Sequence, residues 1–246
     1  MSDEIIQHTD AGTATDQSSG GVEEAKATAP NVTPFGRSDI ISVFVGKQKV
    51  EFGIYKGILV AKSPFFEKWF GVGVKETNEN VVNLLEDEPS AFEVVVEWVY
   101  ANQVRAGKLT LTLVKAYVLA EKLCMPDLQN GIADSIRLRR RVPRPYHASG
   151  ACRMLPEGCP LRDLLLDQFH FRFMKSPNTF KMGTADTDVE VAVELKEEIR
   201  KNPGLATALF WKTVDCSLKR DTGGPMDPRK FAGCNYHVHE DGKKCK

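Results

Sequence analysis

Apolar side chains follow two strand patterns in a row near residue 40. Residues 40–45 are β-branched or aromatic apart from one serine, and Gly46 closes the run, which is typical of a buried or half-buried strand. Over residues 50–55 every second side chain is apolar, the period of a strand with one face on a core and the other toward solvent. The two patterns together predict a β-hairpin.

The apolar positions that come next recur every three or four residues, which indicates one face of a helix. The side chains on this face are Ile58, Leu59, Lys62, Phe65, Phe66 and Trp69. Pro64 lies within the pattern. Because proline has no backbone N–H and its ring clashes with the preceding turn, we expect the helix to break or restart there.

Further along, the spacing predicts one more strand and three more helices. Val82 and Leu84 are typical of a short strand. Pro89 opens a pattern with one apolar face, and proline is favoured at the first position of a helix. A second helix is predicted from about Leu113, and a third over residues 125–136.

The second half of the chain predicts a helical extension. Residues 139–159 are basic at first and then contain proline, glycine and cysteine, so we interpret them as a connector. An amphipathic helix is predicted over 160–169, another over 188–202, and a third from about Leu205. We expect this extension, residues 160–220, to dock on the end of the first domain.

Composition narrows the class of protein. The 246 residues carry 33 basic and 33 acidic side chains, so no excess of charge indicates a nucleic-acid partner. No segment is apolar enough to predict a membrane span or a secretion signal, and six cysteines without regular spacing indicate reduced thiols or metal ligands. We expect an intracellular protein, cytoplasmic and/or nuclear, with a disordered tail over the apolar-poor residues 1–36.

Sequence motifs for catalysis are absent. The chain has no Gly-x-Ser-x-Gly, no phosphate-binding loop that ends in Lys-Ser or Lys-Thr, and no His-Glu-x-x-His. Gly71-Val72-Gly73 lacks the third glycine of a dinucleotide loop, which leaves it as a flexible turn. We therefore expect a protein that acts by binding and not an enzyme.

The first domain resembles a BTB (POZ) domain over residues 37–138. The resemblance depends on Ser38-Asp39-Ile40, Gly46, Phe52, Lys56, Leu59 and Ser63-Pro64-Phe65-Phe66. It implies an α+β fold in which a small sheet is surrounded by helices, here followed by the helical extension. Tyr55 stands where this family usually has histidine. The local hydrogen bond of that histidine is therefore not expected here, whereas the fold is. The phrase Gly158-Cys159-Pro160-Leu161-Arg162 is similar to the C-terminal region of fungal BTB proteins.

The resemblance implies a protein-interaction module, an adaptor or scaffold. Val74, Lys75 and Glu76 fit the apolar-x-Glu motif with which some BTB proteins contact a cullin scaffold, and this would make the protein a substrate receptor of a ubiquitin ligase. An ordinary polar loop is the alternative. Many animal BTB domains dimerise by exchanging an apolar strand and helix that precede the core, and the polar residues 1–36 lack such an element, so homodimerisation stays open.

One basic run follows the first domain. Its arginines are Arg137, Arg139, Arg140, Arg141 and Arg144. The run fits a nuclear import signal or a contact for an acidic partner, and hence a nuclear regulatory protein. It equally fits cations that favour the dipole at a helix C-terminus before two prolines.

Residues 221–246 form a tail that contains cysteine and histidine. Cys234, His237, His239 and Cys245 supply two thiolates and two imidazoles, a complete tetrahedral set for a structural zinc ion. Cys216 could replace one ligand. The alternatives are a mobile polar tail and a disulfide between Cys234 and Cys245, which a reducing compartment disfavours.

Overall fold

A computed structural model shows how these elements are arranged. It describes residues 39–71, 80–140, 143–180, 189–218, 224–231 and 233–239. The tail predicted over residues 1–36 lies outside the described residues. None of the helices in the described ranges has the length and apolar character needed to cross a membrane.

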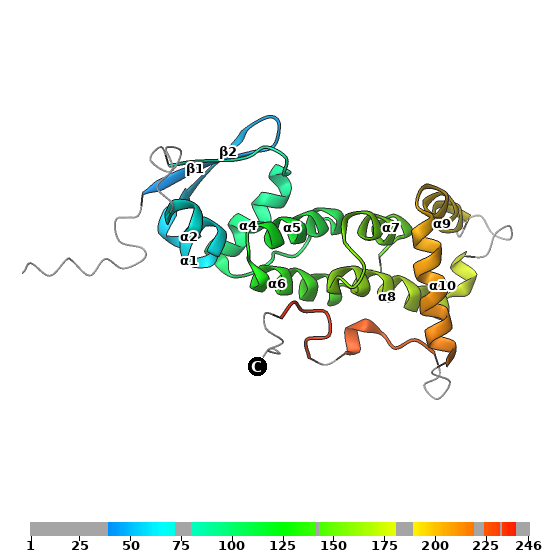
Figure 1. Cartoon of the computed structure of the whole chain (residues 1–246). Coiled ribbons are helices and arrows are strands. Elements are labelled where there is room, and N and C mark those ends of the chain that lie inside the picture. The colour runs from blue at the N-terminus through cyan, green and yellow to red at the C-terminus, as the bar shows by residue number, and fades with distance from the viewer. Residues whose placement is uncertain are drawn as a thin grey trace, which may run out of the picture. The chain divides into compact units, whose positions relative to one another are not determined.

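Three strands form one small sheet, as the alternating pattern predicts. They are β1 (Ile40–Val45), β2 (Val50–Tyr55) and β3 (Val81–Leu84), in the order β2-β1-β3. The predicted hairpin is antiparallel, with Ile40 paired to Tyr55, whereas β3 lies parallel to β1. Figure 1 shows the hairpin beside α1 and α2. The sheet packs against the helices through the alternate buried side chains of β1.

Helices make up most of the remaining described chain. They are α1 (Lys56–Lys62), α2 (Pro64–Gly71), α4 (Pro89–Ala101), α5 (Thr110–Lys122), α6 (Pro126–Arg137), α7 (Pro145–Met154), α8 (Pro160–Lys175), α9 (Val189–Lys201) and α10 (Pro203–Leu218), with short 3₁₀ turns η1 (Pro177–Phe180) and η3 (Pro228–Lys230). Many of these helices begin at proline, whose fixed φ and missing N–H suit the first helical position. The α+β fold predicted from sequence is confirmed.

The break predicted at Pro64 is present, and Ser63 fixes it. Ser63 is fully buried between α1 and α2. Its hydroxyl donates a hydrogen bond of 2.6 Å to the carbonyl of Leu123 and accepts one of 3.4 Å from the backbone N–H of Phe66. Ser63 therefore accepts a hydrogen bond from a backbone N–H in the first turn of α2, and it links this turn to the end of α5.

A single apolar core runs from the sheet into the extension. It contains side chains of β1, α4, α5 and α6 together with Leu161, Leu164 and Leu165 of α8. Helix α5 packs against both α6 and α7, and α8 packs against both α6 and α7 (Figure 1). A second, smaller cluster joins α7 and α8 to Leu205 of α10. The expectation that the extension docks on the first domain is confirmed.

One element differs from the sequence prediction. The connector predicted over 139–159 contains helix α7. A Cβ on Gly150 would lie 2.7 Å from Cδ2 of Leu111 in α5, so the small residue allows the two helices to approach closely. The proline and glycine that resembled loop residues are a helix start and a packing site.

The buried serine between α1 and α2 generates a stability prediction. Replacing Ser63 with alanine leaves the carbonyl of Leu123 without this donor, so we expect the free energy of unfolding to fall by about 1–3 kcal/mol. Urea denaturation followed by circular dichroism measures the change. Ser217→Ala is the control, because its hydroxyl donates to the carbonyl of Thr213 on an exposed helix surface, and we expect a change within about 0.5 kcal/mol. Equal losses in the two variants would contradict the assigned role.

Candidate interaction sites

The C-terminal segment lies back across α6 and α8. We call residues 224–231 and 233–239 the strap; Figure 1 shows it in orange and red beneath these helices. The side chain of Asn130 in α6 holds the backbone of Val238 twice: its amide donates to the Val238 carbonyl over 3.1 Å, and its oxygen accepts from the Val238 N–H over 2.7 Å. Arg137 of α6 donates to the carbonyl of Phe231 over 3.0 Å. These contacts recognise the strap's backbone and not its side chains.

Tyr236 is the main side-chain anchor of the strap. It is 7% exposed, and its hydroxyl donates a hydrogen bond of 2.9 Å to Asp167 of α8. Its ring packs edge-on against Phe231, with the centroids 6.0 Å apart. Burial, followed by the negative charge of Asp167, raises the pKa of Tyr236, so the phenol stays protonated and acts as a donor.

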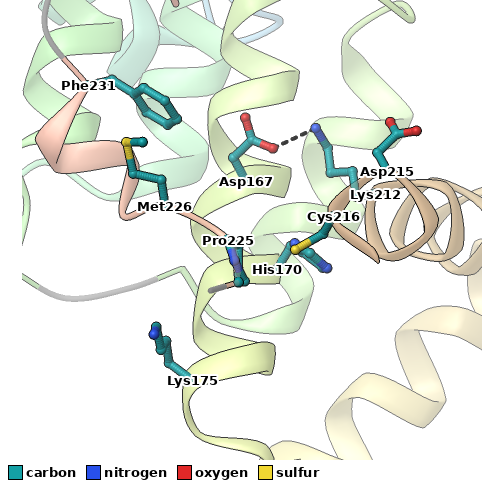
Figure 2. Close-up of a pocket in the computed structure, with 10 residues that line it drawn as sticks. Asp167, His170, Lys175, Lys212, Asp215, Cys216, Pro225, Met226 and Phe231 are labelled. Carbon is teal, nitrogen blue, oxygen red and sulfur yellow. Dashed lines mark hydrogen bonds and ion pairs between the residues drawn. The ribbon is translucent and has the colours of Figure 1, made fainter. Parts of the chain in front are cut away.

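A pocket of about 520 Å³ lies where the strap begins, between α8 and α10. Its lining residues are Asp167, His170, Lys175, Lys212, Asp215, Cys216, Gly224, Pro225, Met226 and Phe231, and most of them are labelled in Figure 2. Lys212 contacts Asp167 over 2.6 Å, the dashed line of Figure 2. The ring of His170 lies 3.2 Å from the hydroxyl of Thr213. The wall is thus of mixed charge, with Asp167 and Lys212 neutralising each other.

Exposed apolar side chains gather where the hairpin meets α4. Ile40 is 60% exposed, Tyr55 47% and Tyr100 49%; we call these three the apolar patch. Ile40 and Tyr55 are cross-strand partners, and the backbone N–H of Tyr55 donates to the hydroxyl of Tyr100 over 3.3 Å. Aromatic side chains that combine an apolar body with a hydroxyl are common anchors of protein interfaces.

The described arginines of the basic run differ in their surroundings. Arg137 pairs with Asp134, and Arg139 donates to the hydroxyl of Thr110. Arg144 lies 2.8 Å from Glu190 and 2.6 Å from Glu194, both in α9. Arg140 is exposed, and Arg141 lies outside the described residues.

Burial, followed by the positive charges of Arg139 and Arg144, lowers the pKa of His147 to about 4. The ring Nδ1 of His147 accepts a hydrogen bond of 2.9 Å from the backbone N–H of Arg144, at the beginning of α7. The neutral imidazole therefore accepts a hydrogen bond at the first turn of α7. Of the two cations near it, Arg144 links this turn to α9 and Arg139 contacts α5.

The cullin-type motif, Val74, Lys75 and Glu76, lies outside the described residues. The structure does place the elements on either side of it, since α2 ends at Gly71 and β3 begins at Val81. The motif is therefore a prediction from sequence, located in the connection between α2 and the sheet.

Three of the four predicted zinc ligands lie on the strap. Cys234, His237 and His239 are half-buried there, and the two imidazole rings have centroids 6.3 Å apart. Cys245 lies outside the described residues, and within the described ranges no group of three or more candidate ligands is arranged to hold a metal. The Nε2 atom of His237 is 3.1 Å from a carboxylate oxygen of Asp134, the kind of partner that commonly orients a metal-binding imidazole. The zinc site stays a prediction.

Sequence reasoning did not find Asn130 or Asp167, the residues that hold the strap. Asn130 is 108 positions from Val238, and Asp167 is 69 positions from Tyr236. Neither has a local motif around it. Only the docking of α6 beside α8 brings the two side chains to one surface.

Comparison with known protein families identifies the first domain. Residues 38–138 match the sequence model of the BTB/POZ domain, and this range agrees with the 37–138 predicted above. Residues 38–138 are therefore a BTB/POZ domain, a protein-interaction module. A search of curated proteins found no match to the chain.

Metal analysis tests the strap's cysteine and histidine set. If the four residues hold zinc, protein purified without chelators contains about one zinc ion per chain, and Cys234→Ser lowers this content several-fold because a thiolate ligand is lost. Cys124→Ser is the matched control, since Cys124 is an exposed free cysteine at the end of α5. Wild-type protein without stoichiometric zinc by elemental analysis would end the proposal.

Proposed function

We propose that this protein is an adaptor or scaffold that binds one partner through its BTB/POZ domain and holds a second through its helical extension. The observation that supports this most is the continuous core from the sheet to α8. Because the core joins domain and extension, two partner surfaces would be kept at a fixed distance. BTB domains act by binding other proteins, and this proposal needs no catalytic step.

The apolar patch is the surface of the BTB/POZ domain that we propose for the first partner. Three exposed apolar side chains meet there, two of them tyrosines. The neighbouring surface is polar: Lys62 donates to Asn102 over 3.0 Å, and both side chains are exposed. An apolar centre beside a polar rim is the usual anatomy of a protein interface. A second copy of this domain could occupy the patch as well as a different protein.

In a more specific form of the proposal, the protein is a substrate receptor of a cullin-type ubiquitin ligase. Its support is the motif Val74-Lys75-Glu76, in the connection before β3 of a domain whose family is now known. In such a complex Val74 would anchor in an apolar pocket and Glu76 would accept polar contacts at the rim. The helical extension would then present the substrate.

A nuclear regulatory role has less support. Arg137, Arg139 and Arg144 each make contacts within the molecule, and an import signal must be accessible to its receptor. Arg139 contacts Thr110 of α5, and Arg144 contacts Glu190 and Glu194 of α9, which supports a structural role for these two arginines.

Removing the apolar patch should remove the first partner. We expect the double variant Ile40→Ser and Tyr55→Ala to recover that partner about tenfold less than wild type in affinity purification, because two central contacts are lost. Leu109→Ser is the matched control, since Leu109 is 75% exposed elsewhere on the domain. Size-exclusion chromatography with light scattering tells whether the partner is a second copy. Unchanged partners and an unchanged oligomeric state would overturn the patch assignment.

A cullin pull-down tests the receptor proposal. We expect the wild-type chain to retain the cullin, and the double variant Val74→Ala and Glu76→Ala to lose about tenfold or more in affinity because anchor and rim contact are both removed. Glu79→Ala, in the same connection, is the control and should bind like wild type. Undiminished binding by the double variant would sink the motif assignment.

A further inference from the structure

The strap lies on α6 and α8 in the manner of a bound peptide. Asn130 and Arg137 hold its backbone at two points, Val238 and Phe231. One side chain, Tyr236, is deeply buried between them. Backbone hydrogen bonds that supply affinity, combined with a pocket that selects one side chain, are how proteins recognise extended peptides.

The polar residues under the strap also have partners of their own that do not belong to the strap. Asn130, Asp134 and Arg137 lie on one side of α6, at the spacing of one helix face. Asp134 pairs with Arg137 within α6, and Asp167 pairs with Lys212 of α10. The opposite sides of α6 and α8 are fixed in the apolar core. The polar groups would be hydrated in an open groove, and the two helices would keep their places.

The strap itself has little regular structure, and it reaches the core at three points: Tyr236 belongs to the main apolar cluster, and Phe231 and Val238 pack against it. Within its described residues the only regular element is the three-residue turn η3, and only Pro228 and Tyr236 are buried. Segments with few buried apolar contacts open at low cost compared with a core. The strap is therefore suited to exchange with another chain that makes the same contacts.

We propose that the surface of α6 and α8 which the strap covers, which we call the groove, is a peptide-binding site that the strap occupies in cis. Its ligand is an extended segment of a partner protein that carries a tyrosine, with a residue two positions later whose backbone pairs with Asn130, as Tyr236 and Val238 do. The tyrosine hydroxyl donates to Asp167, so phenylalanine at that position fits less well. The site is separate from the apolar patch and would serve the second partner of the adaptor.

A synthetic peptide measures this site directly. The probe is a fluorescent peptide of residues 227–239 in which Cys234→Ser prevents oxidation, and binding is followed by fluorescence anisotropy. The receptor is a full-length chain whose residues 231–239 are replaced by a glycine-serine sequence of equal length. We expect it to bind the probe at least about tenfold more tightly than wild type, because in wild type the strap competes from within the chain.

Four further measurements test which contacts hold the peptide. A probe with Tyr236→Phe should bind several-fold more weakly, and one with Tyr236→Ala should not bind detectably. Asn130→Ala in the receptor should weaken binding of the intact probe. A receptor that also carries Ile40→Ser and Tyr55→Ala should bind the probe normally, so failure of the groove and failure of the patch remain distinguishable.

The proposal also has a clear negative result. If the replaced chain does not fold, full-length Tyr236→Ala takes its place, because it keeps the strap and removes only its anchor. No binding of the intact probe by the folded receptor, or equal binding of the intact and Tyr236→Ala probes, would show that the strap is a permanent part of the fold.

Discussion

The burial of α5 on several sides is the constraint on which the arrangement of this protein depends. Its side chains Leu113, Val114, Ala116, Tyr117, Leu119 and Ala120 are all buried. They face α4 and α6 of the BTB/POZ domain as well as α7, which lies between the domain and the extension in sequence. Its solvent-facing side is a narrow stripe that includes Lys115, Val118 and Lys122. The rest of the helix has to be enclosed by its neighbours, so the domain alone would leave apolar surface exposed. The extension is thus a second wall of the same core.

Close helix contacts in this core depend on glycine as much as on large side chains. A Cβ on Gly131 of α6 would lie 2.6 Å from the ring of Trp98 in α4. Gly150 allows the equally close approach of α7 to Leu111. At Gly131 an added methyl group would collide with the rigid indole of Trp98, whereas at Gly150 the end of the Leu111 side chain would have to move. At both places the volume lost at the glycine is filled by the larger residue opposite.

The regular elements could be predicted from sequence because each has its own local signal. The alternation over Val50–Tyr55 and the prolines at helix starts mark β2 and most helices. Helix α7 could not be predicted in this way, because proline and glycine in a short segment indicate a loop. Gly150 has a role in a helix only because Leu111 of α5 packs against it, and this contact is not visible in the sequence. The strap's contacts could not be predicted at all, since the specific pairing of Asn130 with Val238 is a property of folded geometry. Within the predicted sites, Val74–Glu76 and Cys245 lie outside the described residues. Arg137, Arg139 and Arg144 contact other groups of the protein, whereas Arg140 is exposed.

Asp167 contacts two different parts of the chain. One of its carboxylate oxygens accepts from Lys212 of α10 and the other from Tyr236 of the strap. The two donors share one negative charge, so each contact depends on the other. A molecule that displaces Lys212 from Asp167 would strengthen the hydrogen bond between Asp167 and Tyr236. Release of Tyr236 would in turn strengthen the ion pair between Asp167 and Lys212. By thermodynamic reciprocity, events at α10 and at the C-terminal segment are linked through this single side chain.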